Sequence, residues 1–289
     1  MPSLPGWRST SVSGAPDPAY VAACRVLLDV LDALGEQRVA IVLVGAQAIY
    51  VRTGEGDFAV APYTLDADLA LEPAALKPLP DLTGLLEGAG FTHTKDIGIW
   101  SKAVEVNGQP GQVTVDFLVP ERLGGEGRRA ARLEGHGDRV ARKARGLEAA
   151  VVDRQVMRIR AFEEGDARSF DVAVASPGAL LIAKLHKLAD RVEGDRASDK
   201  DALDVLRLLR AFDAAALART LESLSKDAMA GEITREGVEY LDRLFGDARA
   251  PGPRMAARAV ALLEPSNTIV ASCVVLAGEV LAELRRRDG

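Results

Sequence analysis

Two aspartates, Asp66 and Asp68, stand two positions apart in a stretch of alternating apolar and polar residues, 63–71. Because a β-strand has a side-chain period of two, both carboxylates are expected on one face of a strand. Like charges this close repel, and burial would raise their pKa values unless a cation lay between them. Magnesium is commonly bound by one or two carboxylates together with substrate phosphates. The pattern is compatible with a magnesium site and equally with an exposed edge strand that carries two solvated acids.

A third aspartate, Asp116, is expected on a neighbouring strand. Segments 99–106 and 112–119 flank an Asn-Gly-Gln-Pro-Gly sequence, which has the composition of a turn and predicts a hairpin. In the second segment Val115 and Phe117 occupy one face and Asp116 the other. An acid at this position could complete the metal site, or it could be a surface residue or a hydrogen-bond acceptor at a strand end.

A glycine turn between a strand and a helix offers a place for an anion. The apolar run 39–44 predicts a strand covered on both faces, Gly45 and Ala46 turn the chain, and 47–52 predicts a helix. The start of a helix presents free backbone N–H groups and the positive end of the helix dipole, which suits a triphosphate. Gly45 could equally serve only as a tight turn.

The second half of the chain is helical, and one of its lysines is unusual. Lys184 falls within the apolar stripe of an amphipathic helix, and Lys187 marks the edge of the same face. The following helix, 200–209, carries Asp201 and Asp204 about one turn apart. From these residues alone, a buried salt bridge between the two helices is the simplest interpretation.

Length and composition bound the class of protein. The 289 residues can form one large domain or two, and nearly half are apolar, as in soluble globular proteins. Because the net charge is −6, a nucleic-acid partner would need a local basic patch. We find no apolar run near bilayer length and expect no membrane partner. Two cysteines in apolar helical patterns indicate core residues in a reducing cytoplasm.

One such basic patch is the segment 122–145, where arginines and lysines outnumber acids. It has no clear helical stripe and is expected to be a mobile loop or short basic helix beside the site. It could contact a nucleic acid or a triphosphate, or it could be only a solvated insertion.

Together the patterns predict an α+β fold in two parts after a disordered lead-in at 1–19 that is rich in Ser, Pro and Gly. The first domain, 20–175, contains the sheet, and the second, 176–289, is all helical. Further elements are predicted as helices at 20–34 and 76–88 and as strands at 150–152, 156–162 and 170–175.

The combination of these motifs resembles a known family. Val-Gly-Ala-Gln-Ala at 44–48, Thr-Leu-Asp-Ala-Asp at 64–68 and Val-Asp at 115–116 are similar to motifs of the DNA polymerase β-type nucleotidyltransferase superfamily. The later sequences at 180–185 and 199–205 resemble motifs of the AbiEii-type nucleotidyltransferase toxins, the group that includes the MenT toxins. One departure is clear: the superfamily usually has Gly-Gly or Gly-Ser where this chain has Gly-Ala.

The resemblance implies a polymerase β-like mixed sheet flanked by helices, followed by a helical domain that contributes Lys and Asp motifs. It also implies that Asp66 and Asp68 hold two magnesium ions that bridge the triphosphate of an NTP substrate. Asp116 would bind one ion and help deprotonate the attacking hydroxyl. Gly45 and Ala46, at the start of the following helix, would cradle the phosphates.

The resemblance further implies roles for residues around these acids. Lys184 would reach the triphosphate, with Lys187 beside it, and Asp201 would orient Lys184 or the acceptor. Thr64 would lie at the nucleotide, where this group often has a hydroxyl residue. Thr64 could be a phosphorylation site for a cognate antitoxin, because a phosphate on Thr64 would repel the incoming triphosphate.

By analogy, the expected function is that of a cytoplasmic toxin of a bacterial toxin–antitoxin system, which transfers NMP to the 3′ end of tRNA and blocks translation. The basic segment would grip the acceptor stem. One alternative is a small-molecule nucleotidyltransferase of the antibiotic-modifying kind, which would not need a basic patch. Another is an inactive nucleotide-binding or interaction module, for which the Gly-Ala departure is the best support.

Overall fold

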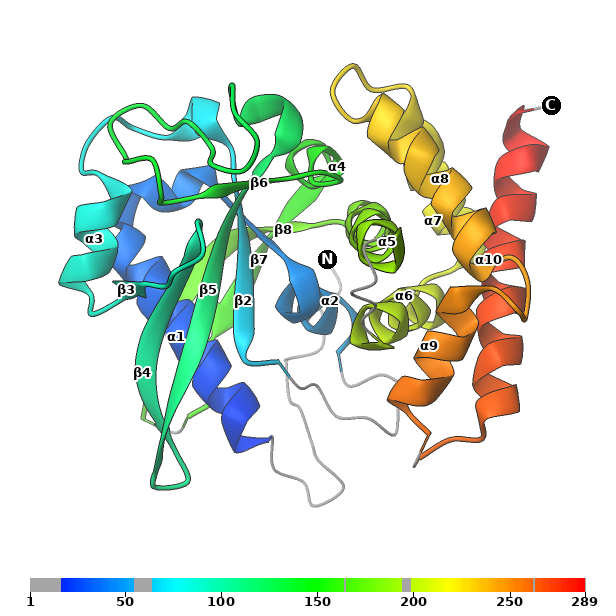
Figure 1. Ribbon diagram of the computed structural model, residues 1–289, viewed down its shortest axis with the longest axis horizontal. Coiled ribbons are helices and arrows are strands. Elements are labelled where there is room, and N and C mark those ends of the chain that lie inside the picture. The colour runs from blue at the N-terminus through cyan, green and yellow to red at the C-terminus, as the bar shows by residue number, and fades with distance from the viewer. Residues whose placement is uncertain (1–16, 55–63, 164, 194–198, 262, 289) are drawn as a thin grey trace.

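The computed structural model describes residues 17–54, 64–163, 165–193, 199–261 and 263–288. Its strands are β1 Ile41–Val44, β2 Asp66–Leu71, β3 Thr92–His93, β4 Ile99–Val106, β5 Gln109–Pro120, β6 Arg142–Ala144, β7 Arg154–Arg160 and β8 Ser169–Ala175. Within the described residues they form one mixed sheet of order β3–β4–β5–β2–β1–β8–β7, with β6 paired to β5 (Figure 1). The predicted mixed sheet is confirmed.

Helices cover both faces of this sheet. They are α1 Pro18–Leu34, α2 Gly45–Thr53, α3 Leu82–Gly88, α4 Glu148–Val152, α5 Pro177–Glu193, α6 Asp199–Ala211, α7 Ala214–Ser225, α8 Gly231–Phe245, α9 Pro251–Ala259 and α10 Ser266–Asp288. α1 and α3 lie on one side, whereas α2, α4 and α5 lie on the other (Figure 1). α7 to α10 pack beyond α5 and α6, which confirms the predicted helical C-terminal region.

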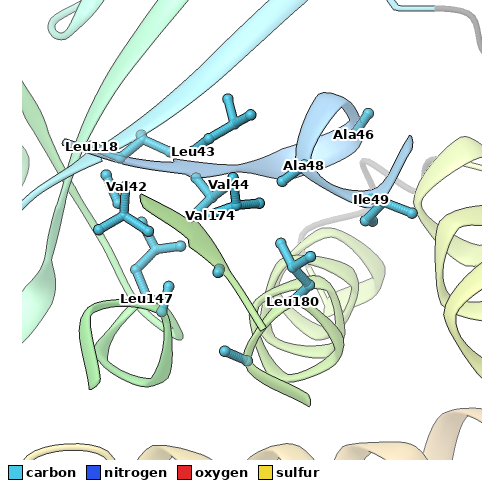
Figure 2. Packing of buried hydrophobic residues seen from close by; sticks show 14 of the residues in the cluster. Val42, Leu43, Val44, Ala46, Ala48, Ile49, Leu118, Leu147, Val174 and Leu180 are labelled. Carbon is cyan, nitrogen blue, oxygen red and sulfur yellow. The ribbon is translucent and has the colours of Figure 1, made fainter. Parts of the chain in front are cut away.

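The core lies between these layers, and it follows the alternation of the strands. Val42 and Val44 of β1 point with Val174 of β8 toward Leu147 and Leu180 (Figure 2). This apolar cluster ties the middle of the sheet to α5, so the first strand and the first C-terminal helix share one core. The division into domains at 175 and 176 stays a prediction.

Turn and cap residues explain where several elements begin. Asn107 and Gly108 both have positive φ, 52° and 72°, so the β4–β5 hairpin has a tight two-residue turn in place of the predicted five-residue one. The helix predicted over 76–88 begins only at Leu82, because Pro78 and Pro80 break the pattern and Asp81 caps the helix by accepting from Gly84 N at 2.8 Å.

Three other predictions need correction. Residues 150–152 belong to α4 and not to a strand, since the buried Glu148 accepts from the backbone N–H of Arg122 and of Gly146 and fixes a helical turn there. β1 begins at Ile41 because a 3₁₀ helix occupies 35–40. α1 begins at Pro18, inside the predicted disordered lead-in, where Asp17 caps it; residues 1–16 lie outside the described residues.

The Ser266–Arg287 stretch of α10 is long and apolar enough, by length and composition, to cross a membrane. The expectation that no run approaches bilayer length is therefore wrong. In the structure α10 packs against α7, α8 and α9 and contributes the buried Ile269, Cys273, Ala277 and Val280 to the helical core. The absence of a membrane partner stays a prediction.

Candidate active site

Three aspartates meet on the α2 face of the sheet. Asp66 and Asp68 belong to β2, and the parallel pairing of β2 with β5 puts Asp116 directly opposite Asp68. On its other side Asp68 is paired with Val44, the last residue of β1. All three carboxylates therefore leave adjacent strands on one face, beside the point where β1 passes into α2.

Gly45 brings the backbone against one of these carboxylates. Its φ is +69°, and a Cβ at this position would lie 2.6 Å from Cγ of Asp68. Only glycine fits both the backbone conformation and the space. The N-terminal turn of α2, with its free N–H groups, is thus fixed beside the acids, where an anion could be bound.

Asp68 is the one of these three carboxylates without a partner among the described residues. It is 8 % exposed, and none of the described residues forms a hydrogen bond or an ion pair with it. Burying an unpaired carboxylate is costly, and hard carboxylate oxygens suit magnesium. The donor set around Asp68 therefore fits a divalent cation.

Asp66 and Asp116 each have a partner within the protein. In the described part of the chain, no three His, Cys, Asp or Glu side chains lie close enough together to hold a metal ion. Asp116 accepts a hydrogen bond from Nη2 of Arg142 at 2.7 Å. Burial and the negative charge of Asp68 raise the pKa of Asp116 to about 6, although Arg142 acts in the opposite direction. A cation shared between Asp68 and Asp116 would relieve this repulsion.

The raised pKa of Asp116 predicts a pH-dependent cost in the metal-free protein. The folded state binds the proton of Asp116 more tightly than the unfolded chain does, so protonation of Asp116 stabilises the fold. This stabilisation is complete below about pH 4 and is lost as the pH rises through about 6. Relative to wild type, D116N should therefore gain about 3 kcal/mol in unfolding free energy between pH 4 and 7. Urea unfolding in the presence of a chelator measures this difference, and a difference independent of pH would contradict it.

Asp66 is connected to the helical region by a chain of two hydrogen bonds. Thr64 is fully buried and its hydroxyl donates to Asp66, while Nζ of Lys200 in α6 donates to Oγ1 of Thr64 at 3.0 Å. Burial acts to raise the pKa of Asp66, but the Thr64 hydrogen bond and the charge of Lys200 outweigh it, so the pKa lies below its usual value. The hydroxyl of Thr64 thus faces inward, and a modification of this residue stays a prediction.

Lys184 forms the buried ion pair between α5 and α6. Its ammonium group lies 3.0 Å from Oδ1 of Asp201 and 2.7 Å from Oδ2 of Asp204. Burial lowers the pKa of Lys184, but the charges of Asp204, Asp201 and Asp68 outweigh that effect and raise it above the ordinary value. Lys184 is therefore locked into the fold near Asp68, and its contact with a triphosphate stays a prediction.

Asp201 also contacts two further cationic side chains. Nη1 of Arg191 lies 2.8 Å from its Oδ2, and Nζ of Lys187 lies 3.5 Å from its Oδ1. Although burial acts to raise the pKa of Asp201, Lys184 and these cations hold it well below its usual range. Lys187 and Arg191 are each about one third exposed, so their charges face the open side of the cluster.

The basic segment 122–145 is mostly irregular in structure and begins in a 3₁₀ turn, and hydrogen bonds anchor it for much of its length. Arg139 donates to the carbonyl of Lys95 at 2.9 Å, and Arg145 donates to Glu236 of α8 at 2.7 Å. The exposed side chains of Arg128 and Arg129, by contrast, have no hydrogen bond or ion pair to any described residue. They are open to an anionic partner.

Sequence reasoning missed Lys200, Arg142 as a partner of Asp116, and Arg191. Lys200 directly precedes Asp201 in the motif at 199–205, which was an available signal. Arg142 was visible only as one cation among many, and its contact depends on how β6 docks.

A family model for nucleotidyltransferases matches residues 23–230, which is most of the chain. The chain therefore belongs to the nucleotidyltransferase family and is an enzyme that transfers nucleotidyl groups. The matched region contains the three acids as well as Lys184 and Asp201. A search of curated proteins and a search of solved structures each gave no match.

Proposed function

We propose that this nucleotidyltransferase is a toxin of a bacterial toxin–antitoxin system that transfers NMP from an NTP to the 3′ end of tRNA. The observation that carries the acceptor assignment is the contact of Arg142 with Asp116. This contact joins the basic segment to the acid that would face the attacking hydroxyl. A polyanion lying along the exposed Arg128 and Arg129 would have its end close to Asp116.

The acids support the transfer step. Asp66, Asp68 and Asp116 would hold two magnesium ions, whose positive charge neutralises the triphosphate when they are bound. Asp116 would take the proton of the acceptor hydroxyl. The acceptor oxygen forms a bond to the α-phosphorus, the bond to the β-phosphate oxygen breaks, and pyrophosphate leaves.

Cations and backbone groups support nucleotide binding. Gly45 and Ala46 open α2 beside Asp68, so the free N–H groups of its first turn would contact phosphate oxygens. Lys187, at the open side of the cluster, and Lys200, which contacts Thr64, would add positive charge near Asp66. Lys184 and Asp201 would keep the two helices aligned at this point and hold positive charge near Asp68.

The test is incubation of the purified protein with total tRNA, magnesium and each α-labelled NTP in turn, beside a D66A/D68A variant. We expect the wild type alone to label tRNA, with tRNA binding that weakens strongly as salt rises. If tRNA stays unlabelled while NTP is bound, the acceptor assignment fails. Transfer to a small hydroxylated molecule in its place would identify an antibiotic-type enzyme.

A further inference from the structure

Arg142 occupies an unusual position for a residue of a basic segment. Its Nη2 contacts Oδ2 of Asp116 at 2.7 Å, and the Asp116 side chain is only 14 % exposed. Since Asp116 also lies opposite Asp68, the guanidinium stands at the edge of the carboxylate pair. The positive charge that Asp116 needs is thus supplied by the chain itself.

The surrounding backbone holds Arg142 firmly in this place. β6 pairs with the part of β5 that lies beyond the first residue of β4, with Arg142 opposite Leu118. Nε1 of Trp100 donates to the carbonyl of Val140 at 3.1 Å, and the N–H of Lys143 donates to the carbonyl of Arg129 at 2.8 Å. These bonds on either side fix the backbone from which the Arg142 side chain extends.

Gly98 provides the room for that side chain. Its φ is +77°, and a Cβ there would lie 2.6 Å from the backbone N of Arg142 and 2.9 Å from its Cγ. A larger residue would push Arg142 away from Asp116. The contact between the guanidinium and Asp116 therefore depends on glycine at position 98.

The pairing of the guanidinium is incomplete. Its Nε is buried and has no hydrogen-bond partner among the described residues, whereas Nη2 carries the bond to Asp116. A guanidinium has five N–H donors, and Asp116 engages it through one carboxylate oxygen. Asp116 could release this single bond without disrupting β6, whose position depends on the backbone bonds.

We propose that Arg142 is a positioning residue that acts as a stand-in counter-ion: it holds the Asp116 carboxylate where a divalent cation binds, and the cation must displace it. This inference rests on the proposed function, because it requires that Asp116 be a metal ligand. Two positive charges held at one carboxylate group repel each other even when each contacts a different oxygen. Arg142 and the cation therefore compete, and Arg142 weakens cation binding in the absence of substrate.

The experiment measures Mn²⁺ binding to the full-length protein without nucleotide, by calorimetry or electron paramagnetic resonance. R142Q should bind Mn²⁺ about tenfold more tightly than wild type, which corresponds to the loss of one competing charge-assisted contact. R142K, which keeps the charge, should stay close to wild type. R158Q is the matched control, since Arg158 forms an ion pair with the exposed Asp171 on the same sheet, and it should leave Mn²⁺ affinity unchanged.

An R142Q affinity equal to that of wild type, or weaker, would overturn the inference. A merely structural role predicts weaker binding, because a disordered Asp116 is a poorer ligand. D68N separates this result from a failure of the proposed function. If D68N weakens Mn²⁺ binding while R142Q has no effect, only the counter-ion role fails. If D68N has no effect, the ion lies elsewhere and both assignments fail.

Discussion

Replacement of Asp68 by asparagine should abolish nucleotidyl transfer while the fold persists. Asp68 lies between Asp116 and Gly45, and it is a buried carboxylate without a partner among the described residues. Cation neutralisation of the triphosphate contributes several kcal/mol to the transition state, so its loss should lower the rate by about a thousandfold or more. The measurement is the rate of label transfer by wild type and variant at equal protein concentration.

The D68N variant should lose activity but should not lose thermal stability. Without the charge of Asp68, the pKa of Asp116 should fall toward its usual value, and D68N should melt at or above the wild-type temperature in the absence of metal. D171N is the matched control, because Asp171 carries an exposed ion pair on the same sheet and should tolerate the change with full activity. Wild-type transfer by D68N would remove the acid cluster from the mechanism.

Replacement of Lys184 by methionine should cost about 3–5 kcal/mol of unfolding free energy, because it leaves buried carboxylates without their cation. Lys184 contacts both Asp201 and Asp204. Arg191 and Lys187 remain beside Asp201, but no other cation among the described residues lies within ion-pair distance of Asp204. Urea unfolding followed by circular dichroism at neutral pH measures the loss.

Two variants make this prediction specific. K187M removes a charge from the same helix at a position that is 35 % exposed, and its cost should stay below about 1 kcal/mol. K184M/D204L replaces the pair by apolar groups and should recover much of the lost stability. If K184M unfolds at the wild-type urea concentration, the ion pair does not hold α5 to α6, and the role of Lys184 lies with the nucleotide alone.

The sequence could predict which residues share a face, because strand periodicity is a local property. The alternation around Asp66 and around Asp116 placed both on the face opposite the apolar side chains, and the register of β2 with β5 agrees. The lysine in an apolar helical stripe likewise indicated the α5–α6 ion pair. In each case a backbone repeat carried the information.

Contacts between distant segments could not be predicted in this way. The bond from Arg142 to Asp116 depends on the docking of β6, and that from Lys200 to Thr64 depends on the packing of α6 beside β2. The short apolar run at 150–152 was compatible with a strand or a helix, and the buried Glu148 decided for a helix. The wrong expectation for Ser266–Arg287 has a different origin, because the length and apolar composition of this stretch are properties of the sequence itself.

The bond between Lys200 and Thr64 spans 136 positions of the chain. During synthesis, Thr64 and Asp66 therefore leave the ribosome long before the lysine that contacts Thr64. Contacts with such wide separation form slowly, after local structure has been made. A ribosome-bound chain without α6 therefore holds its three acids but lacks Lys200, whose charge helps to lower the pKa of Asp66.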